Sequence, residues 1–197
     1  MLISGKNKFV KSHFTSEDEL KKMVVENADY FFGQSSFFLA KELISDKDGF
    51  EKITDGLAVD IANRKWFLVN VALAKHNVWS HIVPQAVKQL VSAEQSTTKQ
   101  LIIELIMQLL REDNNIMKKF NGAGYGNDKE GVFENEARGV LEEIFGKSPV
   151  IEIPIDSISN DLWSWTETLK TNVKLSIVKK YVESGNPKKI IYEIPEE

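Results

Sequence analysis

The 197-residue sequence contains no cysteine, which excludes disulfide bonds and thiolate metal ligands. It also lacks any run of about 18 apolar residues, so we expect no transmembrane helix and no membrane partner. The first residues, MLISGKNKFVKSHF, have no long apolar stretch before a small-residue cleavage site. We therefore expect no signal peptide and favour a cytoplasmic location.

An excess of positive charge is missing as well. The chain has 25 lysines and arginines against 29 aspartates and glutamates, a formal charge of -4. Binding to a nucleic-acid backbone depends on neutralising phosphates, so this protein would need a local basic patch to bind DNA or RNA. The hydrophobic content of 42% is ordinary for a globular domain, and the length suits one domain with a sizeable core.

Two common catalytic signatures are absent. The glycines of "GAGYG" do not follow a strand and open a helix in the manner of a phosphate-binding loop. There is no Gly-x-Ser-x-Gly elbow and no recognisable Ser-His-Asp arrangement. Nucleotide binding through such a loop and serine hydrolysis are therefore not indicated.

Hydrophobic periodicity predicts both helices and strands. Helices are expected at 17–32, 84–95, 96–120, 134–146 and 160–170. Strands are expected at 35–45, 53–62, 66–74, 148–158, 172–184 and 190–196. We interpret this order as one α/β domain over 1–197, in which helices flank a mixed central sheet. A helical segment at about 94–146 separates the hairpin core from the closing strands.

The hairpin at 53–74 carries the most informative residues. Because strand side chains alternate between faces, the second strand should present one wholly apolar face and one mixed face. The mixed face would consist of Trp66, Leu68, Asn70, Ala72 and Ala74, and the apolar face of Phe67, Val69, Val71 and Leu73. The polar Asn70 near the middle of the mixed face marks a candidate site.

Several segments together resemble the PD-(D/E)XK superfamily, the restriction-endonuclease-like nucleases. "Thr54-Asp55-Gly56-Leu57" is similar to the first half of the family motif, and "Val69-Asn70-Val71-Ala72-Leu73" occupies the place of the second half. Gln85 resembles a glutamine often found at the start of the following helix. Glu17 or Glu19 resembles the acidic residue of the opening helix. The resemblance covers about Ser16 to Ala93.

The resemblance implies a restriction-endonuclease-like core and metal-dependent phosphodiester hydrolysis of DNA. It implies Mg²⁺ or Mn²⁺ bound by Asp55, with Glu19 approaching from the opening helix and Asn70 at the second ligand position. Mg²⁺ prefers carboxylate oxygens. Asn70 carries no charge and Ala72 replaces the family lysine, so weak metal binding and impaired cleavage are expected. Gln85 would support the site. A homodimer, or a place in a larger defence or repair complex, is compatible with this function.

Three interpretations of Asn70 and Ala72 stay open. The chain is a natural pseudo-nuclease that kept the fold for binding nucleic acid or protein, or an enzyme inactivated on purpose, or an active enzyme with substitute groups. In the third case Lys88 would replace the lysine, and Asp60 or Glu19 would add a carboxylate. A cleft lined by lysines such as Lys75 and Lys88 would favour nucleic acid over a protein partner.

Two residue groups also have plain structural interpretations. Asp-Gly is a common turn pair, so Asp55 could simply begin a strand. His76 and His81 are five residues apart, whereas a helical zinc pair is usually spaced by three or four, and only His13 remains as a third histidine. We expect these histidines in a loop, where one contacts a substrate phosphate or caps a turn.

Overall fold

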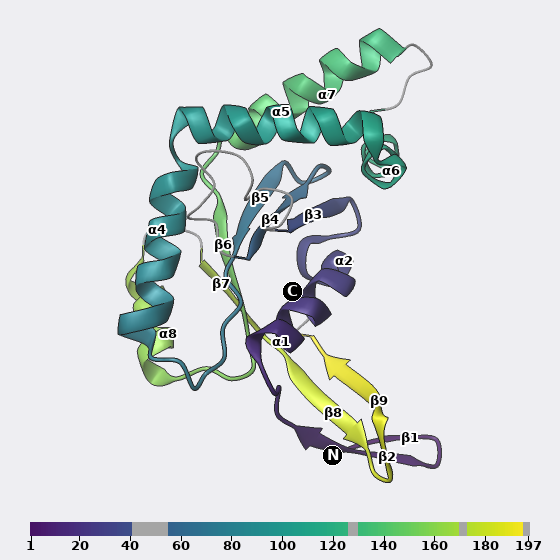
Figure 1. The fold of residues 1–197 in the computed structure, drawn as a ribbon, viewed down its shortest axis with the longest axis vertical. Coiled ribbons are helices and arrows are strands. Elements are labelled where there is room, and N and C mark those ends of the chain that lie inside the picture. The colour runs from purple at the N-terminus through teal and green to yellow at the C-terminus, as the bar shows by residue number, and fades with distance from the viewer. Residues whose placement is uncertain (41–54, 126–129, 170–172, 195–197) are drawn as a thin grey trace.

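A mixed five-stranded sheet forms the centre of the protein (Figure 1). The computed structural model describes residues 1–40, 55–125, 130–169 and 173–194. The strands of the central sheet, in spatial order, are β3 (Ser36–Ala40), β4 (Gly56–Asp60), β5 (Lys65–Val69), β6 (Val150–Ile155) and β7 (Val173–Ile177). The first three are antiparallel neighbours, and β6 and β7 run parallel to β5. The predicted α/β class with a mixed sheet is confirmed.

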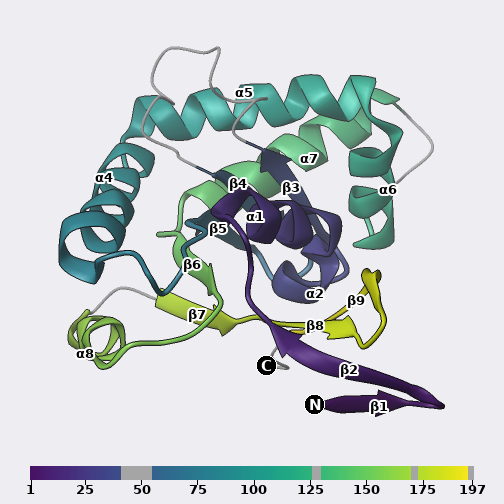
Figure 2. The ribbon, with the colours of Figure 1, turned by 60° about the horizontal axis from the view of Figure 1, so that its bottom comes forward.

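Helices cover both faces of this sheet (Figure 2). One face packs against α1 (Glu17–Glu26) and α2 (Ala28–Phe32). The other face packs against η1 (Val78–Ile82), α4 (Val83–Ala93), α5 (Ser96–Glu112), α6 (Asn114–Gly122), α7 (Glu130–Phe145) and α8 (Asn160–Thr168). The helices α5, α6 and α7 fall in the predicted helical segment. Within the described ranges, none of the helices has the length and apolar character needed to span a bilayer.

The alternation predicted for the second hairpin strand is confirmed. Trp66 and Leu68 pack under the α5–α7 side, whereas Phe67 and Val69 pack under α1 and α2. The regular strand ends at Val69, but the following residues stay extended beside β6. The backbone nitrogen of Asn70 donates to the carbonyl of Glu152 at 2.9 Å, and that of Ala72 donates to Pro154 at 3.1 Å. Positions 70 and 72 therefore continue the ladder beyond β5.

Two predicted helices are each divided in two. The helix expected at 17–32 breaks at Asn27, whose side chain donates to the carbonyl of Met23 at 2.8 Å and whose backbone leaves helical geometry. The helix expected at 96–120 breaks at Asp113, which accepts a 2.8 Å hydrogen bond from the backbone nitrogen of Asn115 and so caps α6. Asn and Asp side chains compete with the helical hydrogen bonds of the backbone, and periodicity does not register this.

A second, four-stranded antiparallel sheet was not predicted. Its order is β1 (Leu2–Ser4), β2 (Asn7–Ser12), β8 (Lys179–Glu183) and β9 (Asn186–Glu193). The single strand expected at 172–184 is wrong, because it divides at the buried Val178 into β7 and β8. The backbone nitrogen of Val178 donates to Ile155 at 2.8 Å, and the chain then leaves the central sheet for the second one.

Some expectations fall outside the described residues. They concern the part of the 35–45 strand beyond Ala40, residues 53–54 of the hairpin and residues 126–129 of the helical segment. They also concern Lys170, Asn172 and residues 195–196 at the ends of the last helix and strands.

Candidate functional site at the open end of the hairpin

Asp55 lies beside position 70, as the family resemblance requires. The antiparallel register pairs Gly56 with Val69, and continued by one residue it sets Asp55 opposite Asn70. The Asp55 Oδ2 atom accepts a 2.8 Å hydrogen bond from the backbone nitrogen of Val71. The carboxylate is thus held against the segment that carries Asn70 and Ala72.

Gly56 allows the backbone conformation with which β4 begins. Its φ is +149°, a conformation that side-chain-bearing residues rarely adopt. A Cβ added there would lie 2.5 Å from the Leu39 carbonyl oxygen and 2.6 Å from the Phe38 ring. Position 56 at the start of β4 therefore requires glycine, and the backbone there places Asp55 beside the neighbouring strand of the hairpin.

Lys21 lies close to Asp55, a contact that the sequence pattern does not indicate. Its Nζ lies 3.8 Å from Asp55 Oδ1, and the two side chains are 21% and 17% exposed. Lys21 belongs to α1, which packs across the sheet through Leu20 and Val24. Nothing in the local sequence indicates this contact, because 34 positions separate the residues and only the helix packing brings them together.

The side chain of Asn70 is buried and makes no hydrogen bond with any described residue. Its side chain is 1% exposed, and within the described parts of the chain neither its oxygen nor its nitrogen has a hydrogen-bond partner. A buried polar group left unsatisfied costs about 1–3 kcal/mol. Such groups in folded proteins call for an explanation beyond stability, and a polar site is one.

Ala72 has a different environment from Asn70. It is 2% exposed and packs in an apolar cluster with Val78, Ile82 and Ala86 and with the isoleucines of β6. Residue 72 is therefore part of the hydrophobic core in this chain.

The helix α4 carries two of the predicted site residues, Gln85 and Lys88, which differ in burial. Gln85 is half-buried, whereas Lys88 is exposed and makes no ion pair with any described residue. Gln89 and Ser92 are buried on the inward face. Gln89 lies between Ala86 and Ala93, whose clusters also hold Ala72 and Leu68 on either side of Asn70.

Glu19 is engaged elsewhere. Its Oε2 accepts hydrogen bonds from the backbone and hydroxyl of Thr15 at 2.7 and 2.9 Å, and its Oε1 binds Lys180. Burial alone would raise the pKa of Glu19, but the hydrogen bonds from Lys180 and Thr15 outweigh it and hold the pKa below its ordinary value. Glu19 and the Ser16 cap together fix the start of α1.

Asp60 is also unable to supply a carboxylate next to Asp55. The two aspartates flank β4 at opposite ends, five residues or about 16 Å apart. Asp60 Oδ2 accepts a 2.6 Å hydrogen bond from the side chain of Asn63 and so closes the turn into β5.

One cavity lies at that turn end of the hairpin, away from Asp55. Its volume is about 690 Å³, and aromatic side chains such as Tyr30, Phe32 and Tyr192 line it. Its two carboxylates are already bound, Asp60 to Asn63 and Asp29 to Lys119 at 2.7 Å. Asp55, Asn70 and Ala72 do not line this cavity.

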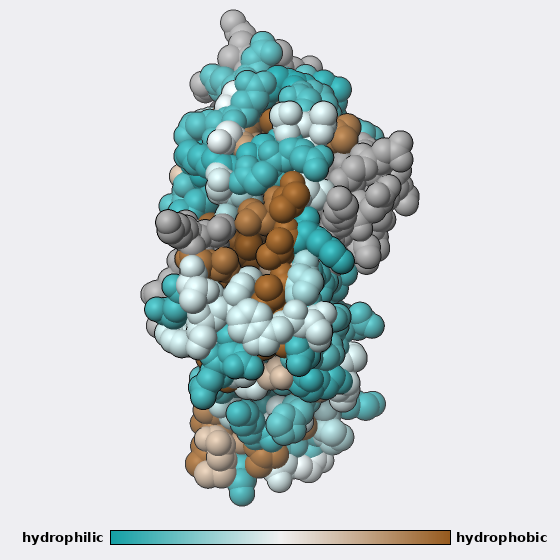
Figure 3. Space-filling model, turned by 90° about the vertical axis from the view of Figure 1, so that its left-hand side faces the viewer, coloured by the Kyte–Doolittle hydropathy of each residue, from teal (hydrophilic) through white to brown (hydrophobic). Residues whose placement is uncertain are grey.

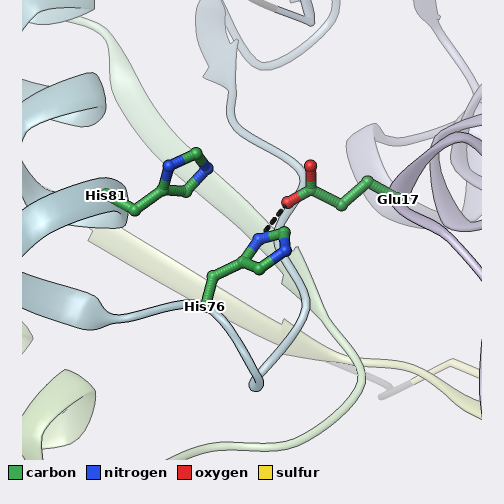
Figure 4. A group of neighbouring side chains, drawn as sticks. All are labelled: Glu17, His76 and His81. Carbon is green, nitrogen blue, oxygen red and sulfur yellow. Dashed lines mark ion pairs between the residues drawn. The ribbon is translucent and has the colours of Figure 1, made fainter.

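A cluster of Glu17, His76 and His81 lies at the start of α1 (Figure 4). One ligand atom of each residue falls within 4.8 Å of the others. The Oε1 atom of Glu17 is 2.6 Å from His76 Nδ1, and the two imidazole rings are 4.9 Å apart in an edge-on arrangement. The sequence spacing does not indicate Glu17 as a partner of the two histidines, because the helix that carries it lies about 60 residues before them.

His76 lies in the expected loop, whereas His81 falls within η1. Asn77 caps η1, since its side chain accepts a 2.9 Å hydrogen bond from the backbone nitrogen of Ser80. His81 lies within the wide turn of η1, where the nitrogen of Ile82 reaches back five residues to the Asn77 carbonyl at 3.4 Å. Such π-type turns are rare and are frequent at functional sites.

Comparison with protein-family models, with curated proteins and with solved structures found no match to this chain.

Proposed function

We propose that this protein has a PD-(D/E)XK-type nuclease fold, acts on DNA, and is impaired in metal-dependent phosphodiester cleavage through Asn70 and Ala72. The observation that carries the proposal is the position of Asp55 opposite residue 70 at the open end of the hairpin. The order of elements supports it, because an opening helix, an antiparallel hairpin and a following helix precede a strand parallel to β5.

The chemistry of the site supports impairment. Phosphodiester hydrolysis requires stabilisation of an anionic phosphorus centre, which Mg²⁺ supplies when carboxylates hold it. Asp55 is the one carboxylate of the motif, and Val71 and Lys21 already engage its two oxygens. Asn70 adds a neutral oxygen, and Ala72 adds no polar group.

Lys21 is the best substitute for the missing lysine. It contacts Asp55, whereas the exposed Lys88 makes no ion pair with a described residue. Lys75 and Lys88 are both exposed on segments that follow the hairpin, where they can meet phosphates without losing an ion pair within the described residues.

Cleavage of plasmid DNA with Mg²⁺ or Mn²⁺ tests this function. The chain as it stands is compared with Asn70→Glu, with Asn70→Glu/Ala72→Lys and with Asn70→Glu/Ala72→Glu. Nicking by a restored form, lost again when Asp55→Asn is added, supports a disabled nuclease. Nicking by the unchanged chain that depends on Asp55 and Lys21 would instead reveal substitute groups and overturn impairment. Asn70→Gln serves as the matched control without a carboxylate.

Binding of a labelled duplex, measured by fluorescence anisotropy, separates the remaining outcomes. Salt-sensitive binding without cleavage in any variant favours a DNA-binding pseudo-nuclease. The absence of both binding and cleavage in every folded variant would overturn a DNA-directed function.

A protein-binding module is the second candidate, and an exposed apolar surface favours it. Val87 and Val91 on α4 are 44% and 58% exposed, and Trp163 on α8 is 55% exposed. Figure 3 shows a hydrophobic patch on the side of the molecule that carries α4 and α8. Exposed apolar patches of this kind mark interaction sites. Sedimentation of the chain and of a Val87→Asp/Val91→Asp variant would show whether the surface pairs two copies.

A further inference from the structure

We propose that Glu17, His76 and His81 form a binding site for one divalent transition-metal ion. This site differs from the Asp55 position predicted for Mg²⁺, and the inference stands whether or not the nuclease proposal holds. It rests on the ligand chemistry, on the direction of the ligand atoms and on the elements that hold them.

The donor set selects the class of metal. Two imidazole nitrogens and one carboxylate oxygen suit Zn²⁺ and its first-row neighbours, whereas Mg²⁺ prefers oxygen ligands throughout. Three protein ligands leave at least one position for water, as in zinc sites that exchange a ligand. His81 is exposed, so the open position faces solvent.

The ligand atoms are close to the separation that a metal imposes. Tetrahedral bonds of about 2.1 Å place ligand atoms about 3.4 Å apart. The three candidate atoms lie within 4.8 Å of one another and already point toward a shared space (Figure 4). Small side-chain rotations therefore suffice to close the site.

The two buried atoms of the cluster are not otherwise satisfied. Glu17 Oε1 and His76 Nδ1 are 2.6 Å apart, yet neither meets the directional requirements of a hydrogen bond with any described residue. A protonated imidazole would make this contact a simple ion pair. A metal ion would give both atoms a partner and would bring in His81 as well.

Separate elements hold the ligands firmly. Ser16 caps α1 and sets Glu17 in its first turn, where the helix dipole favours an anion. His76 follows Leu73, which is buried against α1, and its backbone nitrogen donates to the Leu73 carbonyl at 2.9 Å. His81 is fixed by the π-type turn that continues into α4. A bound ion would thus tie the opening helix to the segment that leads into α4.

The site also adjoins the hairpin end. Lys21 lies one helical turn after Glu17, on the same side of α1, and contacts Asp55. The ion would sit at the same end of the sheet as Asp55.

Metal binding to the intact chain tests the inference directly. After EDTA treatment and dialysis, Zn²⁺ is titrated by calorimetry at fixed pH, and Co²⁺ is added separately as a spectroscopic probe. We expect one Zn²⁺ to bind per chain and millimolar Mg²⁺ not to displace it. The visible absorption of bound Co²⁺ should indicate a low coordination number. Because a ligand of the folded state raises stability, the melting temperature should also rise with Zn²⁺.

Single substitutions assign the ligands. Glu17→Gln, His76→Ala and His81→Ala should each weaken Zn²⁺ binding by about 100-fold, since even the loss of an outer partner costs 10–100-fold. His13→Ala is the matched control and should bind as the unchanged chain does. Circular dichroism confirms that each variant folds.

Three results would overturn the site. They are the absence of stoichiometric Zn²⁺ binding by the unchanged chain, full binding retained by the His76 and His81 variants, and an equal loss in the His13 variant. The first needs no variant, so a folding defect cannot hide it. None of these readouts depends on DNA cleavage, so the failure of the nuclease proposal would leave them unaffected.

Discussion

The Asp55 carboxylate accepts a 2.8 Å hydrogen bond from the backbone nitrogen of Val71, the residue between Asn70 and Ala72. This bond joins the start of β4 to the end of the neighbouring strand, and it satisfies a donor of a residue that is 5% exposed. The same aspartate that the family resemblance assigns to a metal therefore has a structural role in this chain.

Asp55→Ala should destabilise the protein by about 1–3 kcal/mol, because the buried nitrogen of Val71 loses its acceptor. Asp55→Asn should cost less, since the amide oxygen can still accept that hydrogen bond. Urea denaturation of the two variants measures the difference. Equal losses would show that the bond to Val71 contributes little and that the charge contact with Lys21 dominates.

Asn70→Leu should leave stability unchanged or raise it by about 1 kcal/mol. The two side chains have similar shape, and the substitution removes a buried amide that has no partner among the described residues. Thermal and urea unfolding check this in the absence of metal and DNA. A loss of more than about 2 kcal/mol would mean that the amide is satisfied in solution, for example by water.

Ala72→Lys should destabilise the chain by several kcal/mol, because the added ammonium enters the apolar cluster around Ile82 and Ala86. Lys88→Ala is the matched control on an exposed position and should change stability by less than about 0.5 kcal/mol. If Ala72→Lys folds with normal stability, the lysine reaches solvent or the hairpin site. The position would then be a vacant motif position and not a core position.

Gly56→Ala should cost about 2–3 kcal/mol or prevent folding, since the new methyl group would press against the Leu39 carbonyl in a strained backbone conformation. Gly139→Ala is the control. A Cβ there meets nothing within 4 Å, and helix propensity predicts a gain of about 1 kcal/mol. Comparable melting temperatures for the two variants would contradict the strand-entry role of Gly56.

Local structure can be predicted from the sequence where it depends on neighbouring residues. The alternation from Trp66 to Leu73 follows from the two-residue period of a strand. The breaks at Asn27 and Asp113 were missed, although each residue is a known helix competitor, because an apolar stripe continues across it.

Only part of the candidate site can be predicted from the sequence. The pairing of Asp55 with position 70 follows from hairpin register, which two adjacent strands fix by themselves. The contact of Lys21 with Asp55 and the approach of Glu17 to His76 depend on where α1 packs across the sheet. No sequence spacing encodes such contacts between distant segments.

The sequence by itself determined the α/β class, the faces of the hairpin and the pairing of Asp55 with position 70, because these depend on side-chain periods and short-range hydrogen bonds. Tertiary structure alone decided which glutamate of the opening helix joins the histidines, that Asp60 lies at the far end of β4, and that Ala72 is core. Those outcomes are set by the packing of whole helices on the sheet, which buries apolar area and carries the polar side chains along with it.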